Sequence, residues 1–327
     1  MLAAYIRLGD ASAYHEEKPV TRIYSNAIGT VGKTPLVNLT RLAGESRAQI
    51  VGKLEMRNPA GSVKDRLGVA LIEDAEKRGV LKPGTVLIEA TGGNTGIGLA
   101  FAAAIRGYRL ILTMPDSMSK ERVALLRQYG AEVRLTPGIL MTDAVALAKE
   151  LTSHTSGAIN LDQFTNPANP ELHRRTTGPE IWYDTDGAVD VLVSAVGTGG
   201  TLTGVGELLK QKKPSVRCVA VEPEGAAVLS GRPAGQHQIP GIGVGFIPQV
   251  LNRRIVDEVI AVSDSDAFKC ARRLAREEGI LAGVSSGAAL HAALQIGARA
   301  EFSNKMIVVI LADTGERYVS SALFSKE

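Results

Sequence analysis

The stretch Val189-Asp-Val-Leu-Val-Ser-Ala-Val-Gly-Thr-Gly-Gly-Thr201 places an apolar, valine-rich run directly before a glycine-rich turn. A segment with helical periodicity, 201–212, follows the glycines. A buried strand that passes through a tight turn into a helix is the repeating unit of a parallel sheet. This stretch therefore predicts an α/β fold.

Short apolar runs alternate with longer periodic segments from about Gln49 onward. The alternation predicts a doubly wound pattern with more than one sheet, and ligands of such folds bind at the carboxyl ends of the strands. We expect linkers in the turn-rich segments 166–170 and 231–240. The expected strands are 50–56, 86–90, 109–114, 132–135, 158–161, 189–196, 216–222 and 306–312, and the expected helices are 63–79, 95–106, 119–129, 141–152, 170–182, 201–212, 263–278 and 287–298.

Length and composition exclude several classes of protein. The 327 residues exceed what one core usually serves, which favours two domains. A net charge of +3 without any basic run argues against nucleic-acid binding, and the apolar runs are too short to cross a membrane. Cys218 and Cys270 belong to no ligand cluster, so we expect no metal site and a reducing cytoplasm. Residues 1–20 carry no secretory signal and are interpreted as an N-terminal arm.

The glycine-rich turn after residue 196 is the strongest candidate for a phosphate site. Its glycines let the backbone wrap an oxyanion, Thr198 and Thr201 add hydroxyl groups, and the following helix dipole favours negative charge. No Gly-Lys-Ser/Thr follows, and Leu202 occupies the last glycine position of a dinucleotide fingerprint. A small phosphorylated ligand is therefore favoured over a nucleotide, and a nicotinamide-dependent dehydrogenase is disfavoured.

A lysine begins another predicted helix, in Asn58-Pro-Ala-Gly-Ser-Val-Lys-Asp-Arg66. Ser62 is expected to cap this helix and Asp65 to complete a capping box, which places Lys64 in the first turn. The positive end of the helix dipole disfavours an ammonium there, and a neutral amine is what a nucleophilic lysine needs. The alternative interpretation is a solvated surface lysine.

Two further strand-to-helix junctions carry polar groups. Thr91-Gly-Gly-Asn-Thr-Gly96 is either an anion-binding loop at a helix N-terminus or a tight turn held by its Asn and Thr side chains. Gly283-Val-Ser-Ser-Gly287 matches the nucleophile elbow of serine hydrolases. Only His291 follows Ser285, with no acidic residue between them, so the triad order fails and we expect Ser285 to supply a hydroxyl hydrogen bond.

Together, a phosphate loop, a nucleophilic lysine, an anion-binding loop and a lone serine are what pyridoxal 5'-phosphate requires. Over roughly 22–325 the chain resembles the cysteine synthase (O-acetylserine sulfhydrylase) family of fold-type II, β-substituting pyridoxal-phosphate enzymes. The matching segments are Gly32-Lys-Thr-Pro-Leu-Val37, 58–66, 93–96, Gln163-Phe-Thr-Asn-Pro-Ala-Asn169, 197–203, Gly241-Ile-Gly-Val-Gly-Phe-Ile-Pro248, 284–287 and Gly315-Glu-Arg-Tyr318.

The resemblance implies a role for each matched residue. Lys64 would hold the cofactor as a Schiff base and then remove the substrate Cα proton. Asn94 would bond the cofactor's ring oxygen, and Ser285 would face its pyridine nitrogen. The phosphate would be held by Gly197, Thr198, Gly199, Gly200 and Thr201; the substrate would be bound by Thr91, Gly92, Gly93, Thr95, Gln163 and Gly241.

The resemblance also implies a two-domain fold like that of the tryptophan synthase β subunit, with the cofactor in the interdomain cleft. A smaller mobile domain, 57–166, would carry the substrate loop, and 21–56 with 167–327 would form the larger domain. The reaction implied is loss of acetate from O-acetyl-L-serine to a bound aminoacrylate, then addition of sulfide to give L-cysteine. A cytoplasmic homodimer is expected, with the C-terminal tail of serine acetyltransferase as a candidate partner.

One substitution keeps other activities open. The family usually has serine at the position of Gly92, where it helps bind the substrate carboxylate. Its absence leaves open O-phosphoserine sulfhydrylase, cystathionine or lanthionine synthase, β-cyanoalanine synthase, a diaminopropionate-type enzyme, or a weakly active regulatory paralogue. Restoring serine at position 92 is expected to raise the affinity for O-acetylserine.

Overall fold

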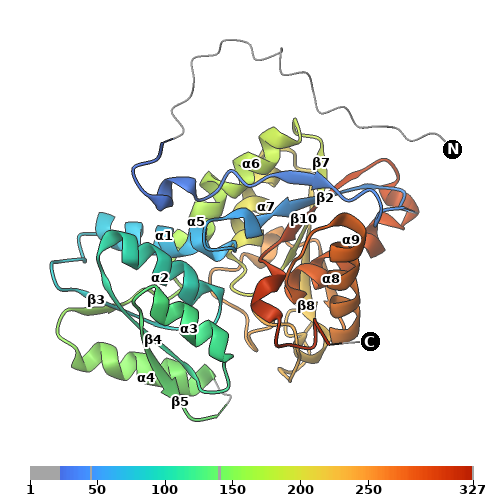
Figure 1. Cartoon of the computed structure of the whole chain (residues 1–327). Helices are drawn as coiled ribbons and strands as arrows, with labels where there is room; N and C mark the ends of the chain where they lie inside the picture. The colour runs from blue at the N-terminus through green and yellow to red at the C-terminus, as the bar shows by residue number, and fades with distance from the viewer. Residues whose placement is uncertain (1–22, 45, 139–140, 326–327) are drawn as a thin grey trace.

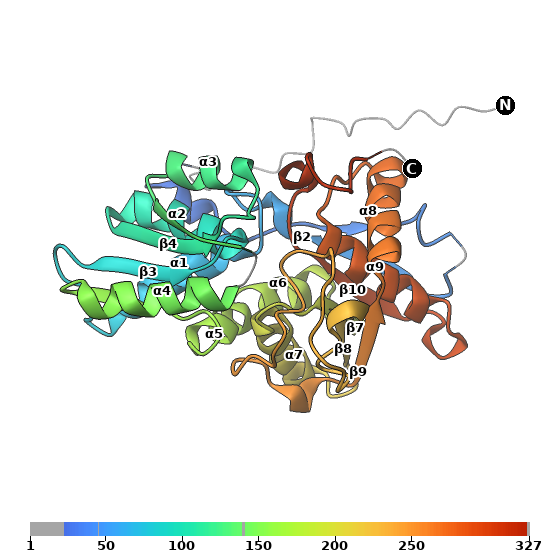
Figure 2. The same ribbon diagram turned by 90° about the horizontal axis from the view of Figure 1, so that it is seen from below.

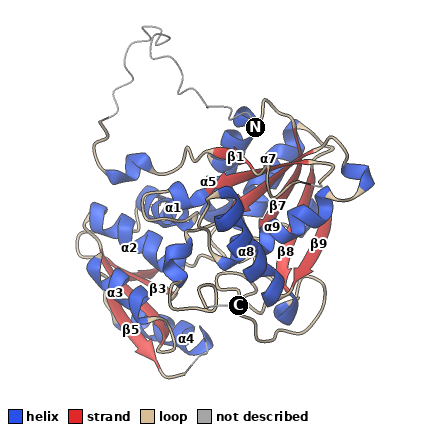
Figure 3. Cartoon of the chain, turned by 45° about the vertical axis from the view of Figure 1, so that its right-hand side comes forward, coloured by secondary structure: helices blue, strands red, loops and turns tan. Residues whose placement is uncertain are grey.

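A computed structural model describes residues 23–44, 46–138 and 141–325, so the predicted arm over 1–20 lies outside the described residues. The chain forms two separate β-sheets, each with helices on both faces (Figures 1 and 3). This confirms the predicted α/β fold with mostly parallel sheets. Among the described residues, no helix combines the length and apolarity needed to span a membrane.

The larger sheet has the strand order β1-β2-β10-β7-β8-β9, and only β1 is antiparallel to its neighbour. Alternate side chains serve opposite faces. Val193 and Val309 pack with α8 and α9, whereas Leu192 and Val308 pack with α7 on the other face. Figure 2 shows these helices on either side of the sheet. The elements are β1 (Leu36–Asn38), β2 (Gln49–Leu54), β7 (Val189–Ala195), β8 (Arg217–Pro223), β9 (Glu258–Val262), β10 (Met306–Leu311), α5 (Ala168–Arg175), α6 (Thr177–Asp184), α7 (Gly200–Lys212), α8 (Asp264–Glu278) and α9 (Val284–Gly297).

The smaller sheet is entirely parallel, in the order β5-β4-β3-β6. Leu87 and Leu112 lie in a core shared with α1 and α2, and Ile88 and Ile111 pack with α4 on the opposite face. The elements are β3 (Val86–Ala90), β4 (Arg109–Pro115), β5 (Glu132–Thr136), β6 (Ala158–Asn160), α1 (Lys64–Lys77), α2 (Asn94–Arg106), α3 (Lys120–Gln128) and α4 (Met141–His154).

Helices α1 and α2 meet backbone to backbone through two glycines. A Cβ on Gly98 would lie 2.2 Å from the carbonyl oxygen of Lys64, and a Cβ on Gly68 would lie 2.2 Å from that of Gly98. Only glycine permits so close an approach. The contact fixes the first turn of α1 against α2, whose own first residue is Asn94.

Several expected boundaries are wrong. The predicted helix 170–182 is two helices, because Thr176, with φ −126° and ψ −75°, separates α5 from α6. The predicted linker 166–170 instead leads directly into α5, and strands β1 and β9 were not expected. The four strands of the smaller sheet all lie within 57–166 and those of the larger sheet outside it, while the domain boundaries themselves stay a prediction.

Candidate active site

Lys64 is the first residue of α1, as predicted, but the cap differs from the predicted one. The residue at the N-cap position is Val63 rather than Ser62. The Ser62 hydroxyl accepts a hydrogen bond from the Lys64 N–H at 3.2 Å, and Asp65 Oδ2 accepts one from the Ala60 N–H at 2.6 Å. The predicted N-cap is therefore one residue too early, although the predicted pair does meet, with the Ser62 hydroxyl donating to Asp65 Oδ1 at 3.3 Å.

The Lys64 amine is predisposed to be neutral. Burial lowers its pKa to about 8, against the opposing attraction of the carboxylates of Asp313 and Glu55. Burial is therefore the main cause of the lowered pKa, whereas the sequence alone indicates the helix dipole as the cause. Within the described part of the chain the Lys64 amino group has no hydrogen bond or ion pair, which leaves it available as a nucleophile.

Asn94 is held between two residues from the end of the chain. Its Nδ2 donates to Asp313 Oδ2 at 2.7 Å, and its Oδ1 accepts from Arg317 Nη1 at 2.5 Å. Both partners follow β10 of the larger sheet, whereas Asn94 begins α2 beside the smaller one. The two sheets are joined at this point.

Residues 312–313, which follow β10, also link the segment of Lys64 to the segment of Ser285. The carbonyl oxygen of Ala312 accepts from the Val63 N–H at 2.8 Å, and that of Asp313 accepts from the Gly283 N–H at 3.0 Å. Ser285 lies in the first turn of α9, buried, and its hydroxyl makes no hydrogen bond among the described residues. Residues 312–313 therefore bring Lys64 and Ser285 to one place.

The predicted substrate loop is folded as one unit. Thr91 Oγ1 accepts from the Gly93 N–H at 3.2 Å, and Thr95 Oγ1 donates to Gln163 Oε1 at 2.7 Å. Gly92 adjoins Met118, since a Cβ on Gly92 would lie 2.6 Å from the Met118 sulfur. The space of a serine side chain at position 92 is thus taken by a methionine.

The predicted phosphate loop runs from the end of β7 into α7. Gly199 has φ +81°, which favours glycine, and a Cβ on Gly200 would lie 1.8 Å from Asn169 Oδ1. Thr198 Oγ1 accepts from Asn169 Nδ2 at 3.0 Å. A Cβ on Gly197 would lie 2.2 Å from the carbonyl oxygen of Gly241, so this predicted substrate residue borders the loop.

Thr201 is bound by a histidine that sequence reasoning missed. Thr201 Oγ1 lies 3.1 Å from His173 Nε2, and His173 Nδ1 lies 2.9 Å from the Thr177 hydroxyl. Burial and the charges of Arg66 and Lys64 hold the His173 pKa well below its usual value. A neutral imidazole can orient the Thr201 hydroxyl without adding charge.

The missed residues have different signals in the sequence. Arg317 lies within the matching segment 315–318 and Asp313 two positions before it, and Asn169 ends the matching segment 163–169. His173 stands in no matching segment and has no signal beyond its place in a helix. Only the fold brings it to the phosphate loop.

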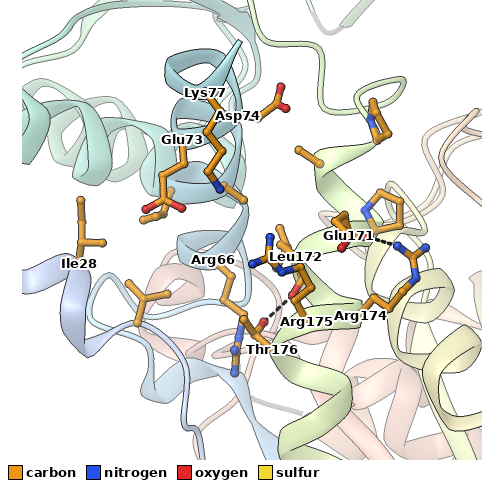
Figure 4. A pocket seen from close by; sticks show the side chains of 16 residues that line it. Ile28, Arg66, Glu73, Asp74, Lys77, Glu171, Leu172, Arg174, Arg175 and Thr176 are labelled. Atoms are coloured by element: carbon orange, nitrogen blue, oxygen red, sulfur yellow. Dashed lines mark hydrogen bonds and ion pairs between the residues drawn. The ribbon is translucent and has the colours of Figure 1, made fainter. Parts of the chain in front are cut away.

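Two other candidate sites lack the predicted chemistry. A cavity of 710 Å³ between α1 and α5 is lined by Arg66, Glu73 and Arg174 among others, and by none of the predicted site residues (Figure 4). His291 approaches Cys270 at 3.8 Å and Gln295 at 2.9 Å rather than Ser285, so no hydrolase triad forms. The described residues contain no cluster of metal-ligating side chains.

The geometry fits pyridoxal phosphate. The glycine loop packs too closely against Gly241, Leu251 and Asn169 to carry side chains, and it leads into the N-terminus of α7, where backbone N–H groups favour an anion. A lysine with a lowered pKa and a serine hydroxyl without a hydrogen bond among the described residues come from adjoining segments.

Comparison with known proteins gives the same result. The family of pyridoxal-phosphate dependent enzymes matches residues 28–313. The chain is 51% identical to cysteine synthase A of Escherichia coli (strain K12), covering 94% of this chain and 97% of that one. It is 48% identical to the cysteine synthase of Staphylococcus aureus (strain Mu50), over 94% and 98% of the two chains. The crystal structure of cysteine synthase (OASS) from Entamoeba histolytica superposes with a TM-score of 0.91 at 45% identity, over 94% and 93% of the chains. The chain is a member of the cysteine synthase family of pyridoxal-phosphate-dependent enzymes.

Proposed function

We propose that this protein is a pyridoxal-phosphate-dependent cysteine synthase, which replaces the acetate of O-acetyl-L-serine by sulfide. The observation that carries the proposal is Lys64, a lysine with a pKa lowered to about 8 at the start of α1. Residues 312–313 hold its segment next to that of Ser285. Relatives at 48–51% identity favour cysteine synthesis over the other β-replacement reactions.

The proposed cofactor residues come from the starts of α1, α2 and α9 and from the loop before α7. Bound pyridoxal phosphate supplies an electron sink for the substrate Cα. Lys64 Nζ binds the cofactor covalently and later takes the Cα proton, a task that suits an amine with a pKa near 8. The N–H groups of Gly197 to Thr201 bind the phosphate, and Asn94 and Ser285 orient the ring.

The proposed substrate residues lie between the end of β3 and the start of α2, with Gln163 shortly after β6. Thr91, Gly93, Thr95 and Gln163 bind the substrate carboxylate, supported by the 2.7 Å bond between Thr95 and Gln163. Movement of residues 57–166 onto the bound substrate would exclude water. Gly92 offers no hydroxyl, so this chain relies on backbone N–H groups and on the threonines.

The test is turnover of O-acetyl-L-serine and sulfide by the purified protein, with L-cysteine and acetate measured as products. The proposal predicts equal amounts of the two, and Lys64→Ala should abolish both. Asp190→Asn, at the far end of β7, is the control for general destabilisation. Acetate release without cysteine, or full activity in Lys64→Ala, would contradict the assignment.

We also infer a cytoplasmic homodimer, on the family resemblance and on two buried free cysteines that suit a reducing compartment. Light scattering after gel filtration tests the dimer, and cell fractionation tests the compartment. Binding of the serine acetyltransferase tail rests on the resemblance alone. Calorimetric titration with a peptide of that tail tests it.

A further inference from the structure

Asp313 carries a buried carboxylate with one oxygen unused. Its side chain is fully enclosed, and Oδ2 accepts from Asn94 Nδ2 at 2.7 Å and from the Tyr318 hydroxyl at 2.6 Å. Oδ1 has no partner among the described residues. Burying a hydrogen-bond acceptor without a partner costs free energy, so the presence of a carboxylate at this position calls for a reason.

The surroundings are built to keep this carboxylate in place. A Cβ on Gly283 would lie 2.1 Å from Asp313 Oδ1, so glycine there makes the room that the carboxylate occupies. The Asp313 backbone is fixed by the Gly283 N–H, and Asp313 pairs with Ser62 in an isolated antiparallel bridge. Asp313 therefore cannot easily turn away from Asn94.

The contacts on both sides of Asn94 determine which way its amide faces. A carboxylate only accepts hydrogen bonds and a guanidinium only donates them. Asp313 consequently holds the Asn94 nitrogen, and Arg317 holds the Asn94 oxygen. One of the two amide N–H groups points to Asp313, which leaves the second as a donor for a ligand.

We infer that Asp313 is a positioning residue for the cofactor ring, acting through Asn94: it fixes the Asn94 amide so that an N–H, not the carbonyl oxygen, faces the ring oxygen. This inference rests on the proposed function. It assigns to the segment after β10 a part in cofactor binding beyond its structural link between the two sheets.

The test measures the affinity of the cofactor-free protein for pyridoxal phosphate by fluorescence titration, with the melting temperature of each cofactor-free variant recorded alongside. Asp313→Ala is expected to weaken the affinity about tenfold, the order of magnitude for losing one charge-assisted hydrogen bond. Asp313→Asn keeps an acceptor oxygen toward Asn94, so most of the wild-type affinity for pyridoxal phosphate should remain in this variant. Asp190→Asn, which removes an ion-paired carboxylate far from the site, should leave the affinity unchanged.

A double-mutant cycle separates action through Asn94 from a general structural role. In the Asn94→Ala background, Asp313→Ala should weaken the affinity less than twofold further. An undiminished tenfold loss in that background, or no loss from Asp313→Ala alone, would overturn the inference. If Asp313→Ala does not fold, Arg317→Gln supplies the same cycle from the other side of the amide, with the same non-additivity expected.

Failure of the proposed function gives a different result. If the wild-type protein does not bind pyridoxal phosphate, the proposed function falls and the inference falls with it. If the wild-type protein binds the cofactor and makes cysteine while the cycle is additive, only the role of Asp313 is wrong.

Discussion

The carboxylate of Glu89 accepts a hydrogen bond from the backbone N–H of Asp162 at 3.0 Å, in a place almost closed to water. Burial raises the pKa of Glu89 to about 7, and the charge of Asp162 adds to this rise. Glu89 lies two positions before Thr91, where the predicted substrate loop begins. It also accepts a hydrogen bond from the Gln163 N–H at 3.5 Å. The carboxylate with the raised pKa is therefore in direct contact with the segment that carries Gln163.

The raised pKa of Glu89 gives a first prediction. The folded pKa lies above the ordinary 4.5, so between pH 4.5 and 7 the folded protein holds a proton that the unfolded chain has lost. The contribution of Glu89 to stability therefore falls as the pH rises through this window, by about 3 kcal/mol at most. Glu89→Gln should reduce the drop in melting temperature between pH 5 and pH 8 by several degrees, measured by calorimetry.

The control for Glu89→Gln is Glu224→Gln, which changes an exposed glutamate. It should leave the pH dependence of the melting temperature as in the wild type. Equal drops between pH 5 and pH 8 in the wild type and in Glu89→Gln would show that Glu89 titrates normally in the folded protein.

Lys64, a basic group where Glu89 is an acidic one, gives a second prediction. Burial lowers the Lys64 pKa to about 8, so the neutral amine predominates above that pH. The rate at which pyridoxal forms a Schiff base with the cofactor-free protein should rise with pH and level off above about 8. Stopped-flow absorbance measures it, with Lys64→Ala subtracted as background. A rate still rising steeply past pH 10 would mean an ordinary surface lysine.

A third prediction concerns the glycine contact between α1 and α2. Gly98→Ala should raise helix propensity by about 1 kcal/mol, yet its Cβ would lie 2.2 Å from the Lys64 carbonyl oxygen. Overpacking against backbone costs about 1–3 kcal/mol, so we expect a lower melting temperature together with weaker cofactor binding. Ala104→Gly, at an exposed position of the same helix, lowers propensity without moving Lys64. It should reduce the melting temperature and leave cofactor affinity unchanged.

A fourth prediction revises the expected effect of a serine at position 92. The Met118 sulfur would lie 2.6 Å from its Cβ, so the methionine must move before a serine fits. Gly92→Ser alone is therefore expected to leave the KM for O-acetylserine unchanged or raised. Combined with Met118→Ala it should lower KM several-fold below that of Met118→Ala alone, in steady-state assays. A much lower KM for O-acetylserine in the single Gly92→Ser variant would show that the Met118 side chain moves aside without a measurable cost.

The sequence predicted most of the elements because strands in parallel sheets are continuous apolar runs, as in Val189–Ala195 and Met306–Leu311. Leu36–Asn38 has only three residues, none of them buried, and Glu258–Val262 is a partly exposed edge strand. Neither has the pattern of a buried strand. Long-range contacts were equally out of reach, since Asp313 and Asn94 are 219 positions apart.

The visible absorption spectrum of the purified protein with pyridoxal phosphate shows whether Lys64 binds the cofactor and whether the bound cofactor reacts with O-acetyl-L-serine. It is recorded before and after O-acetyl-L-serine is added, and again after sulfide. A cysteine synthase shows a visible band that changes with O-acetyl-L-serine and returns with sulfide, and Lys64→Ala lacks this band. A band that ignores O-acetyl-L-serine, or one that persists in Lys64→Ala, would contradict the proposed function.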